Sequence, residues 1–406
     1  MNFHVKQVWK CLPIAETGTM RKKLNDLEIQ AAAYLKSLAH TQKEIATFLG
    51  LSESSVSRLL NEARAGGYLK EAVPEFDRTK ISESIMRDIQ ARIAPKKLAE
   101  ALGKFQIKHD LPFIPDVRIF PASHAGSSKE VFVLRSKDFG RSAAGYATEL
   151  LLRSRGCVGV SWGTTIANLV TGISFYCRRG ARERKPIMFL PLCGEPLGST
   201  GTTNCSASTL ATNLDDILNG GSTRTFSLAA VPALIPRSFT AKEVSIIKKL
   251  IGHVEAYKEI FERTTATTVR EEPLINKVDT ILTSVGAAET TLAWGDDELG
   301  RTAGFNRSDL KELIIGDISG VLIPKTNLRK TDQTTLIDIQ QRWTGVREDQ
   351  LRDCANRAKR LKTPGVIVST IGRNKAAIVV ECVARGLINQ LLIDQDLADE
   401  LVRLLG

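Results

Sequence analysis

Residues 41–60 read TQKEIATFLGLSESSVSRLL, and this stretch predicts two short helices with a tight turn between them. Thr41 and Glu44 have capping-box spacing, in which each side chain accepts a hydrogen bond from the other residue's backbone N–H. Gly50 permits the left-handed turn that ends the first helix, and Ser52 is suited to cap the second. This arrangement is typical of a helix-turn-helix, whose second helix enters a DNA groove.

The two helices each have an apolar and a polar face. The apolar positions follow the helical period and are Ile45, Phe48, Leu49, Val56, Leu59, Leu60 and Ala63. The outer positions of the second helix carry hydroxyl, amide and arginine side chains, which are the types that bond base edges and phosphates. The alternative is an ordinary helical hairpin inside a core. The residues predicted to contact DNA are Thr41, Ser52, Ser54, Ser55, Ser57, Arg58, Asn61 and Arg64, the last on phosphate.

The flanking sequence predicts the rest of a small domain. Residues 24–39 predict a third helix, and residues 68–73 alternate weakly as a short wing strand does. We therefore assign residues 24–73 to a winged helix-turn-helix domain. Residues 1–23 are an N-terminal extension, either a solvated tail or a DNA-contacting arm. Residues 74–115 predict a helical linker or an oligomerisation segment.

Composition favours a globular protein with a polyanionic partner. The chain has 406 residues, enough for two or three domains, and 43% of them are hydrophobic while 25% are charged. Its formal net charge of +11 favours contacts with phosphates and release of their counterions. Positive charge permits DNA binding without demonstrating it.

Cysteine usage and the apolar runs bear on the compartment. The seven cysteines are widely scattered, and neither they nor the histidines form a cluster with metal-ligand spacing. We therefore predict no disulfide framework, no metal and no cofactor. No apolar run approaches the roughly 20 residues needed to cross a bilayer, and the N-terminus lacks a signal-peptide core. The sequence predicts a cytoplasmic protein without a membrane partner.

Residues 116–406 predict an α/β domain. Short apolar runs that end in glycine-rich loops alternate with helical patterns, which favours a mostly parallel sheet with helices on both faces. The predicted strands are Val117–Phe120, Val131–Leu134, Cys157–Trp162, Ile187–Leu192, Phe226–Val231, Ile281–Val285, Val321–Ile323, Val366–Thr370 and Leu391–Ile393.

The strongest candidate ligand site follows the strand at residues 157–162. Gly163, Thr164 and Thr165 lie where this strand meets a helix, so backbone N–H groups, the helix dipole and two hydroxyls are predicted to face one anion. Ser161 is predicted to line the same site. The alternative is a routine turn in which Thr164 only caps the helix.

Other strand ends contribute to the same crevice, because open parallel sheets bind ligands beyond the carboxyl ends of their strands. Gly194 and Glu195 follow one strand, and Gly286 follows another. Lys375 begins a helix after a third and is suited to neutralise a phosphate. Asp317, in Gly316-Asp-Ile-Ser-Gly320, completes the predicted effector site.

Two enzymatic interpretations compete with simple binding. Residues 159–163, GVSWG, match the G-x-S-x-G nucleophile elbow, but only His253 lies downstream of Ser161 and no HGGG-type oxyanion segment is present. Sugar-phosphate isomerases and deaminases need a placed general base, and four carboxylates are available for this role. They are Glu195, Asp279, Glu289 and Asp317.

Taken in order, several motifs resemble the SorC family of bacterial transcriptional regulators, from about residue 24 to residue 405. The matching stretches are Glu44-Ile-Ala, Val56-Ser-Arg-Leu-Leu, Ala63-Arg-Ala-Gly-Gly, Gly159-Val-Ser-Trp-Gly-Thr-Thr165, Val231-Pro-Ala233, Gly316-Asp-Ile-Ser-Gly320 and Gly372-Arg-Asn-Lys-Ala376. The resemblance implies a helix-turn-helix fused to a non-catalytic sugar-binding domain similar to glucosamine-phosphate deaminases and phosphoribose isomerases.

The resemblance also implies partners and residue roles. Such regulators bind operator DNA and phosphorylated sugars or related metabolites, and they assemble as dimers or tetramers. By position, Gly163, Thr164, Thr165 and Lys375 would hold the ligand's phosphate, and Gly194 and Gly286 would line its pocket. The family usually has a glycine pair where this chain has Gly194-Glu195, and a carboxylate there would repel a phosphate unless it turns away or bonds a hydroxyl or amine.

We therefore predict a non-enzymatic transcriptional regulator whose DNA affinity responds to a small effector. Two alternatives remain open from sequence alone. One is a sugar-phosphate isomerase or deaminase with an accessory DNA-binding domain, and the other is a scaffold that binds DNA without any small ligand.

Overall fold

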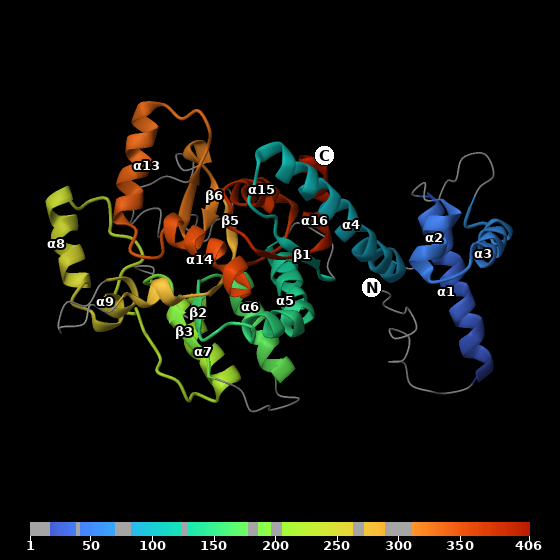
Figure 1. Ribbon diagram of the computed structural model, residues 1–406, viewed down its shortest axis with the longest axis horizontal. Coiled ribbons are helices and arrows are strands. Elements are labelled where there is room, and N and C mark those ends of the chain that lie inside the picture. Colours follow the sequence, from blue (N-terminus) through green and yellow to red (C-terminus); the bar gives the residue numbers. More distant parts are fainter. Residues whose placement is uncertain are drawn as a thin grey trace. The chain divides into compact units, whose positions relative to one another are not determined.

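The computed structural model describes residues 17–37, 41–69, 83–122, 129–177, 186–195, 205–262, 272–288 and 311–406. The chain divides into two compact units, residues 1–93 and residues 94–406; their elements are labelled in Figure 1. Within the ranges given, none of the helices combines the length and the hydrophobicity needed to cross a membrane.

Three helices form the core of the first unit: α1 (Thr17–Ser37), α2 (Gln42–Leu49) and α3 (Glu53–Ala65). Leu35, Ile45, Val56 and Leu60 are buried together between them, so the apolar faces predicted from helical periodicity are confirmed. The predicted third helix is present but begins at Thr17 instead of residue 24.

The predicted caps are also confirmed. Thr41 accepts a hydrogen bond from the Glu44 backbone N–H at 3.2 Å, and the Glu44 carboxylate accepts one from the Thr41 backbone N–H at 2.8 Å. Gly50 is left-handed at φ 67°, and Ser52 accepts from the Ser55 backbone N–H at 3.2 Å. Beyond α3 the chain is described only to residue 69, so the remainder of the predicted wing strand lies outside the described residues.

A six-stranded parallel sheet organises the second unit. Its strands are β1 (Asp116–Ile119), β2 (Cys157–Val160), β3 (Met188–Pro191), β4 (Thr280–Thr283), β8 (Gly365–Thr370) and β9 (Gln390–Ile393), in the order β1-β9-β8-β4-β2-β3. Every residue of β2, β4, β8 and β9 is buried. Continuous burial is expected of strands whose two faces are both covered by helices, and it explains why their sequences are mainly apolar.

A small antiparallel sheet adjoins the end of β4. It contains β5 (Val285–Ala287), β6 (Ile314–Ile318) and β7 (Val321–Pro324) in that order. The single strand predicted over 281–285 is therefore two strands separated at Ser284. Strand β6 was not predicted as a strand, because Gly316 and Asp317 are residue types that disfavour strands.

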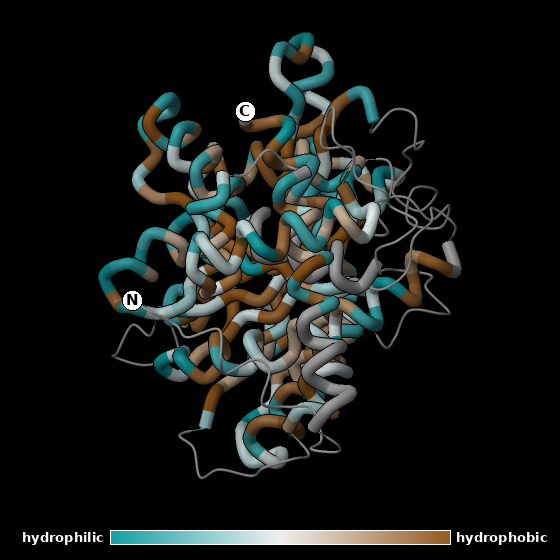
Figure 2. The backbone as a smooth tube through the Cα atoms, turned by 90° about the vertical axis from the view of Figure 1, so that its right-hand side faces the viewer, coloured by the Kyte–Doolittle hydropathy of each residue, from teal (hydrophilic) through white to brown (hydrophobic). Residues whose placement is uncertain are grey.

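Helices cover both faces of the parallel sheet. The helices of the second unit are α4 (Glu83–His109, which begins in the first unit), α5 (Lys129–Leu151), α6 (Thr164–Cys177), α7 (Ala207–Asn219), α8 (Ala241–Ile251), α9 (Glu255–Phe261), α13 (Lys330–Arg342), α14 (Glu348–Leu361), α15 (Ala376–Ala384), α16 (Gln395–Leu405) and the 3-10 turns η4 (Leu274–Lys277) and η5 (Arg373–Lys375). One face packs on α5, α6 and α7, and the other packs mainly on α14, α15 and α16. Hydrophobic residues accordingly concentrate in the interior (Figure 2).

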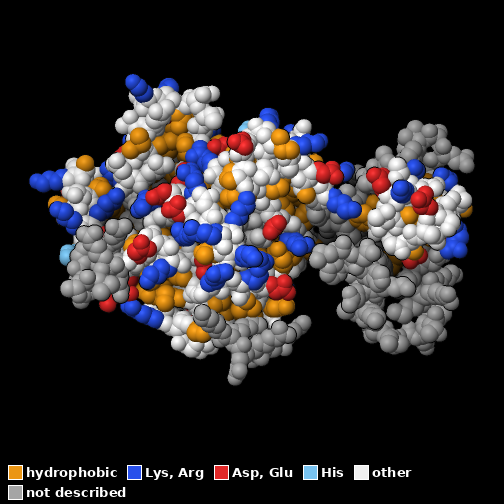
Figure 3. All heavy atoms as spheres, viewed as in Figure 1, with side chains coloured by type: hydrophobic (Ala, Val, Ile, Leu, Met, Phe, Trp, Pro, Cys, Tyr) orange, Lys and Arg blue, Asp and Glu red, His pale blue; other side chains and the backbone are white. Residues whose placement is uncertain are grey.

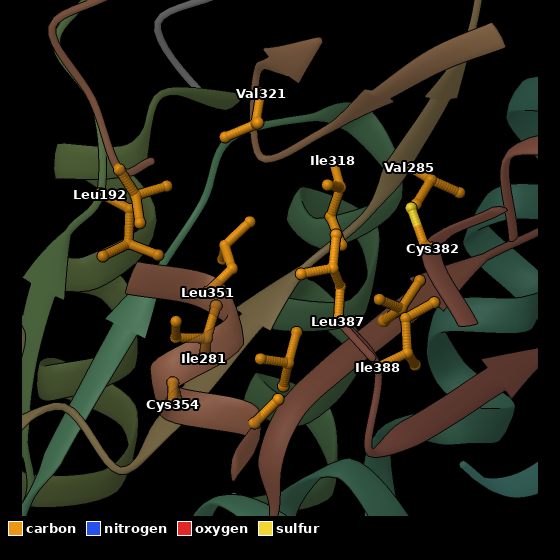
Figure 4. Close-up of a cluster of buried hydrophobic side chains, with 14 of the residues drawn as sticks. Leu192, Ile281, Val285, Ile318, Val321, Leu351, Cys354, Cys382, Leu387 and Ile388 are labelled. Carbon is orange, nitrogen blue, oxygen red and sulfur yellow. The ribbon is translucent and has the colours of Figure 1, made fainter. Parts of the chain in front are cut away.

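The second of these cores joins the small sheet to the large one. Figure 4 shows Ile281 on β4, Val285 on β5 and Ile318 on β6 together with Leu351 on α14 and Cys382 on α15. All five are buried. The small sheet is thus packed against the same helices that cover the parallel sheet.

Two predicted strands are wrong. Residues 131–134 lie within α5, because a short apolar run fits a strand or a helix equally and here helical sequence continues to Leu151. Within residues 226–231, Phe226, Leu228 and Val231 are buried and the other three residues are exposed, and the segment forms no strand. The Leu228 backbone N–H is donated to the Ser208 hydroxyl at 3.0 Å, and the Val231 N–H is donated to the Leu228 carbonyl at 2.9 Å.

Candidate functional site

The outer face of α3 carries the side chains predicted to contact DNA. Arg58, Asn61 and Arg64 are exposed, and Ser57 is half-buried. The Arg58 guanidinium lies 3.8 Å from the Glu62 carboxylate, and Arg64 donates to the Asn61 side-chain oxygen at 2.8 Å. Because such exposed pairs are weak, about 0–1 kcal/mol, a stronger acceptor can replace them. Figure 3 shows basic side chains interspersed with acidic ones on the visible surface.

The remaining predicted contacts gather at the two helix starts. The Ser52 hydroxyl lies 2.8 Å from that of Ser54 and 2.9 Å from that of Ser55, and all three stand at the start of α3. Thr41 stands at the start of α2, where its hydroxyl donates to Glu44 at 3.0 Å. Thr41 and Ser52 therefore cap their helices, whatever further contacts they make.

The topology of the parallel sheet indicates where a ligand crevice is expected. From β2 the chain crosses α6 to β3 at one edge, whereas from β4 it goes on to β8 and β9 on the other side. Strands β2 and β4 are adjacent and parallel. The order of the strands thus reverses between them, and such a switch point opens a crevice at the carboxyl ends of both strands.

The turn from β2 into α6 borders this crevice. Gly163 has a φ of 124°, a left-handed backbone that favours glycine. Its N–H is donated to the Cys205 carbonyl at 3.0 Å, so in this structure that N–H is not free for an anion. The helix begins at Thr164, and its first-turn N–H groups, including that of the buried Thr165, have no intrahelical acceptor.

Ser161 precedes this turn and is only 1% exposed. Its hydroxyl is buried without a hydrogen-bond partner among the residues that the structure describes. A nucleophile elbow requires an exposed serine on a strained turn, whereas Ser161 is buried and does not have a positive φ. The geometry disfavours the hydrolase interpretation and leaves a buried polar group beside the crevice.

At the end of β3, Gly194 and Glu195 approach the chain near Val231. A Cβ on Gly194 would collide with the Val231 carbonyl, and the Glu195 backbone N–H donates to this carbonyl at 2.8 Å. Burial raises the pKa of the Glu195 carboxyl, although hydrogen bonds from Ser208 and Ser206 act in the opposite direction. Its Oε1 is buried and accepts no hydrogen bond from the described part of the chain.

Lys375 and Asp317 form the charged part of the site. Lys375 is 8% exposed, and burial lowers its pKa to about 8 while the Asp317 charge acts in the opposite direction. Asp317 also accepts a hydrogen bond from the Gly320 N–H at 3.0 Å, and it pairs with Gly286 across β5 and β6.

Charge effects link the end of β3 to this pair. Burial raises the pKa of the Cys193 thiol, and the charges of Glu195 and Asp317 add to the effect. Glu195 in turn bonds the hydroxyls at the start of α7, and Thr164 hydrogen-bonds the neighbouring Cys205 thiol. Glu195 and Asp317 thus both act on the Cys193 thiol, and Asp317 also acts on Lys375.

Sequence reasoning missed the start of α7. Ser206 caps this helix by accepting from the Thr209 N–H at 3.1 Å, and Cys205 and Ser208 contact the predicted site residues as described above. The cap before an amphipathic helix was the available signal. The contact between the Trp162 and Trp343 rings, 5.8 Å between centroids, joins positions too distant in sequence to be found by pattern.

One predicted catalytic candidate is at the wrong end of the sheet. Asp279 precedes β4, so it lies at the amino end of the strands and away from the crevice. It accepts from the Ser154 hydroxyl at 2.7 Å and from the Arg155 backbone N–H at 2.9 Å, which is a structural role. Glu289 lies outside the described residues.

Comparison with known proteins places the fold. No model of a protein family matches the chain, and no curated protein does. Among solved structures, it is similar to the full-length sorbitol operon regulator SorC from Klebsiella pneumoniae, with a TM-score of 0.51 and 17% identity over 94% of this chain and 99% of that one. A DeoR family transcriptional regulator from Listeria monocytogenes gives a TM-score of 0.49 with 17% identity over 75% of this chain and 99% of that one. The likeness to SorC shows that the two chains share a fold.

Proposed function

We propose that this protein is a DNA-binding transcriptional regulator whose operator affinity is controlled by a small phosphorylated metabolite. The observation that carries the proposal is the outer face of α3, whose exposed arginine, amide and hydroxyl side chains stand on a doubly capped helix-turn-helix. The shared fold with SorC, a sorbitol operon regulator, supports it because that likeness extends over 94% of this chain.

In this proposal α3 is the recognition helix. Arg58 and Asn61 contact base edges and Arg64 contacts phosphate, after each gives up its weak intrahelical partner. A homodimer or homotetramer places two such helices on half-sites separated by whole turns of the duplex. The effector changes operator affinity by binding more tightly to one arrangement of the subunits than to the other.

The effector occupies the crevice between the ends of β2 and β4. Its phosphate meets the N-terminus of α6 at Thr164 and Thr165 and the ammonium of Lys375. Ser161 and the free Oε1 of Glu195 form hydrogen bonds with the rest of the effector. A carboxylate oxygen can accept such a bond from a hydroxyl or an amine. A phosphorylated sugar supplies both kinds of group, which is why we favour this class of effector.

Selection of bound sequences from random DNA, followed by anisotropy titrations, tests the DNA-binding half. A specific site with a steep salt dependence is the expected result, and binding without sequence preference contradicts it. A thermal-shift screen of phosphorylated and free sugars tests the effector half. A ligand at about 100 times its Kd should stabilise the fold by roughly 2.7 kcal/mol.

The alternative is a sugar-phosphate isomerase or deaminase on the same scaffold, and one observation favours it. Lys375 is buried beside Asp317 with a pKa of about 8, a value suited to proton transfer near neutral pH. Incubating the protein with a panel of sugar phosphates and following them by NMR separates the two functions. Binding without turnover supports the regulator, whereas turnover that Asp317→Asn abolishes supports the enzyme.

A further inference from the structure

A buried ion pair crosses from α5 to the segment that follows β9. The Arg135 guanidinium bonds the Asp394 carboxylate and lies 2.7 Å from that of Asp396. The Arg135 side chain is 13% exposed and that of Asp394 only 1%. These residues are more than 250 positions apart, so the pair is a tertiary connection that local sequence does not predict.

The same carboxylate fixes the loop that ends in Lys375. One oxygen of Asp394 accepts from the Gly372 backbone N–H at 3.1 Å and from the Leu397 N–H at 3.1 Å. Gly372 has a φ of 94°, and its carbonyl accepts from the Lys375 N–H at 3.1 Å. Asp394 therefore holds the first residue of the turn whose last residue is the predicted phosphate ligand.

The helix that carries Arg135 also contacts the opposite side of the crevice. Gly140 on α5 and Gly172 on α6 lie so close that a Cβ on either would collide with the other helix's backbone. One turn before Gly140, the Ser136 hydroxyl accepts from the Asn168 side chain at 2.8 Å. Because α6 begins at Thr164, α5 directly touches one of the two elements that we propose to hold the phosphate, and it reaches the other through Asp394.

The arrangement is not optimised for stability alone. The Arg135 Nε–H is buried without an acceptor among the described residues, and a buried ion pair seldom repays its own desolvation. Such a pair is well suited to fixing geometry, since its two carboxylates and one planar guanidinium admit few arrangements.

We propose that Arg135 is a positioning residue of the effector site, which holds Lys375 in place by fixing the Gly372 turn through Asp394. The inference rests on the proposed function, because it takes Lys375 as the ligand of the effector's phosphate. Arg135 itself does not touch the effector. Arg135 instead fixes the conformation of the Gly372 turn, to which the effector binds.

The test compares Arg135→Met with Arg141→Met, an exposed position on the same helix. Hydrogen exchange followed by mass spectrometry reports the order of residues 370–377 without any ligand. We expect about tenfold or faster exchange there in Arg135→Met, an intermediate rate in Arg135→Lys, and parental rates in Arg141→Met. Peptides from β2 and β4 should exchange at the parental rate in all variants.

A titration with inorganic phosphate, followed by NMR, gives the second readout. Arg135→Met should weaken phosphate binding by about tenfold, and Arg141→Met should leave it unchanged. If Arg135→Met does not fold, Asp396→Asn removes the half-exposed partner of Arg135, which also lies 3.9 Å from the Arg373 guanidinium, and should accelerate exchange in the same peptide by a smaller factor.

Three results overturn the inference. Parental exchange of residues 370–377 in both Arg135→Met and Asp396→Asn means that the ion pair does not order the turn. Equal acceleration throughout the second unit means that Arg135 is merely structural. A parent that binds no phosphate contradicts the proposed function and removes the effector role from Arg135, even where its exchange results hold.

Discussion

The helix-turn-helix and the effector crevice differ in how far apart in sequence their parts lie. The caps and the apolar faces of the α2–α3 pair lie within 25 positions, from Thr41 to Ala65, and α1, which packs on these faces, directly precedes them in sequence. The proposed effector site instead draws on Thr164, Glu195, Asp317 and Lys375, which come from four separate segments of the second unit.

Because of this difference, the two regions should respond differently to amino-acid substitution. A local unit depends on caps and a small core, so a single substitution changes its stability or its surface and little else. An assembled site depends on crossovers that bring remote backbone together, so its affinity also responds to residues outside the site, such as Arg135. A substitution should therefore change either the effector-free DNA affinity or the effector affinity, and not both.

The largest expected effect is on effector binding. Lys375→Ala removes the buried ammonium, and loss of such a charged contact is worth about 2–5 kcal/mol of binding free energy. Calorimetry should show phosphate-containing ligands losing that affinity, while DNA binding without effector stays at the parental level. Lys330→Ala, an exposed lysine at the start of α13, is the control. Equal ligand affinity in Lys375→Ala and the parent would remove Lys375 from the site.

The next effect is on DNA recognition. Arg58→Ala should cost about 1–3 kcal/mol at the specific site and reduce discrimination between sequences. Arg64→Ala should instead weaken binding to all sequences alike and lower the salt slope by about 1, because its predicted contact is a phosphate. Neither variant should change the thermal shift produced by the effector. Full selectivity retained by Arg58→Ala would show that this arginine does not contact bases.

A smaller effect follows from pH. Burial places the pKa of Lys375 at about 8, against a usual value of 10.5, so its charge is lost above pH 8. Phosphate affinity should fall as pH rises from 7.5 to 9.5, by at most about tenfold per pH unit. Unfolded Lys375 keeps its proton up to pH 10.5, so between 8 and 10.5 the unfolded state binds more protons and stability should rise.

With rising pH, phosphate affinity should therefore fall while the free energy of unfolding rises. Both trends should be absent in Lys375→Ala if Lys375 causes them. Calorimetric titrations and denaturant unfolding at the same pH values measure them. An affinity that is flat from pH 7.5 to 9.5 would contradict the proposed role of the ammonium.

The smallest effect concerns the first unit. Thr41→Ala removes the capping box of α2 and should lower the stability of that unit by about 1 kcal/mol. Thr47→Ala, an exposed threonine within the same helix, is the control. Thermal unfolding resolves the change, and the effector affinity should be the same in both variants. A shift no larger than that of Thr47→Ala would mean that the cap contributes little.

The helix-turn-helix was predicted from sequence more completely than the effector region, because its parts lie close together in sequence. Capping spacing and helical periodicity are local, so the caps at Thr41 and Ser52 and the buried faces of α2 and α3 were all predicted correctly. In the second unit most strands of the parallel sheet were found from their apolar runs. Residues 131–134 and 226–231 were wrongly predicted as strands, because an apolar run alone does not distinguish a strand from a buried helix or turn.

Contacts between segments far apart in the sequence could not be predicted from local sequence patterns. Residues near the predicted turns, such as Gly163 and Lys375, were named from local chemistry. That the Gly163 N–H bonds Cys205, or that Asp394 joins Arg135 to Gly372, follows from the order of the strands and the packing of α5. Those connections decide which N–H groups remain for a ligand.

The most direct test of the account measures one affinity under two conditions. Anisotropy titrations of the selected operator, with and without the metabolite found by thermal shift, should give different Kd values for the parent protein. Lys375→Ala should give a single Kd, equal to the effector-free value. An operator affinity that saturating metabolite leaves unchanged in the parent would contradict the claim that the crevice controls the α3 face.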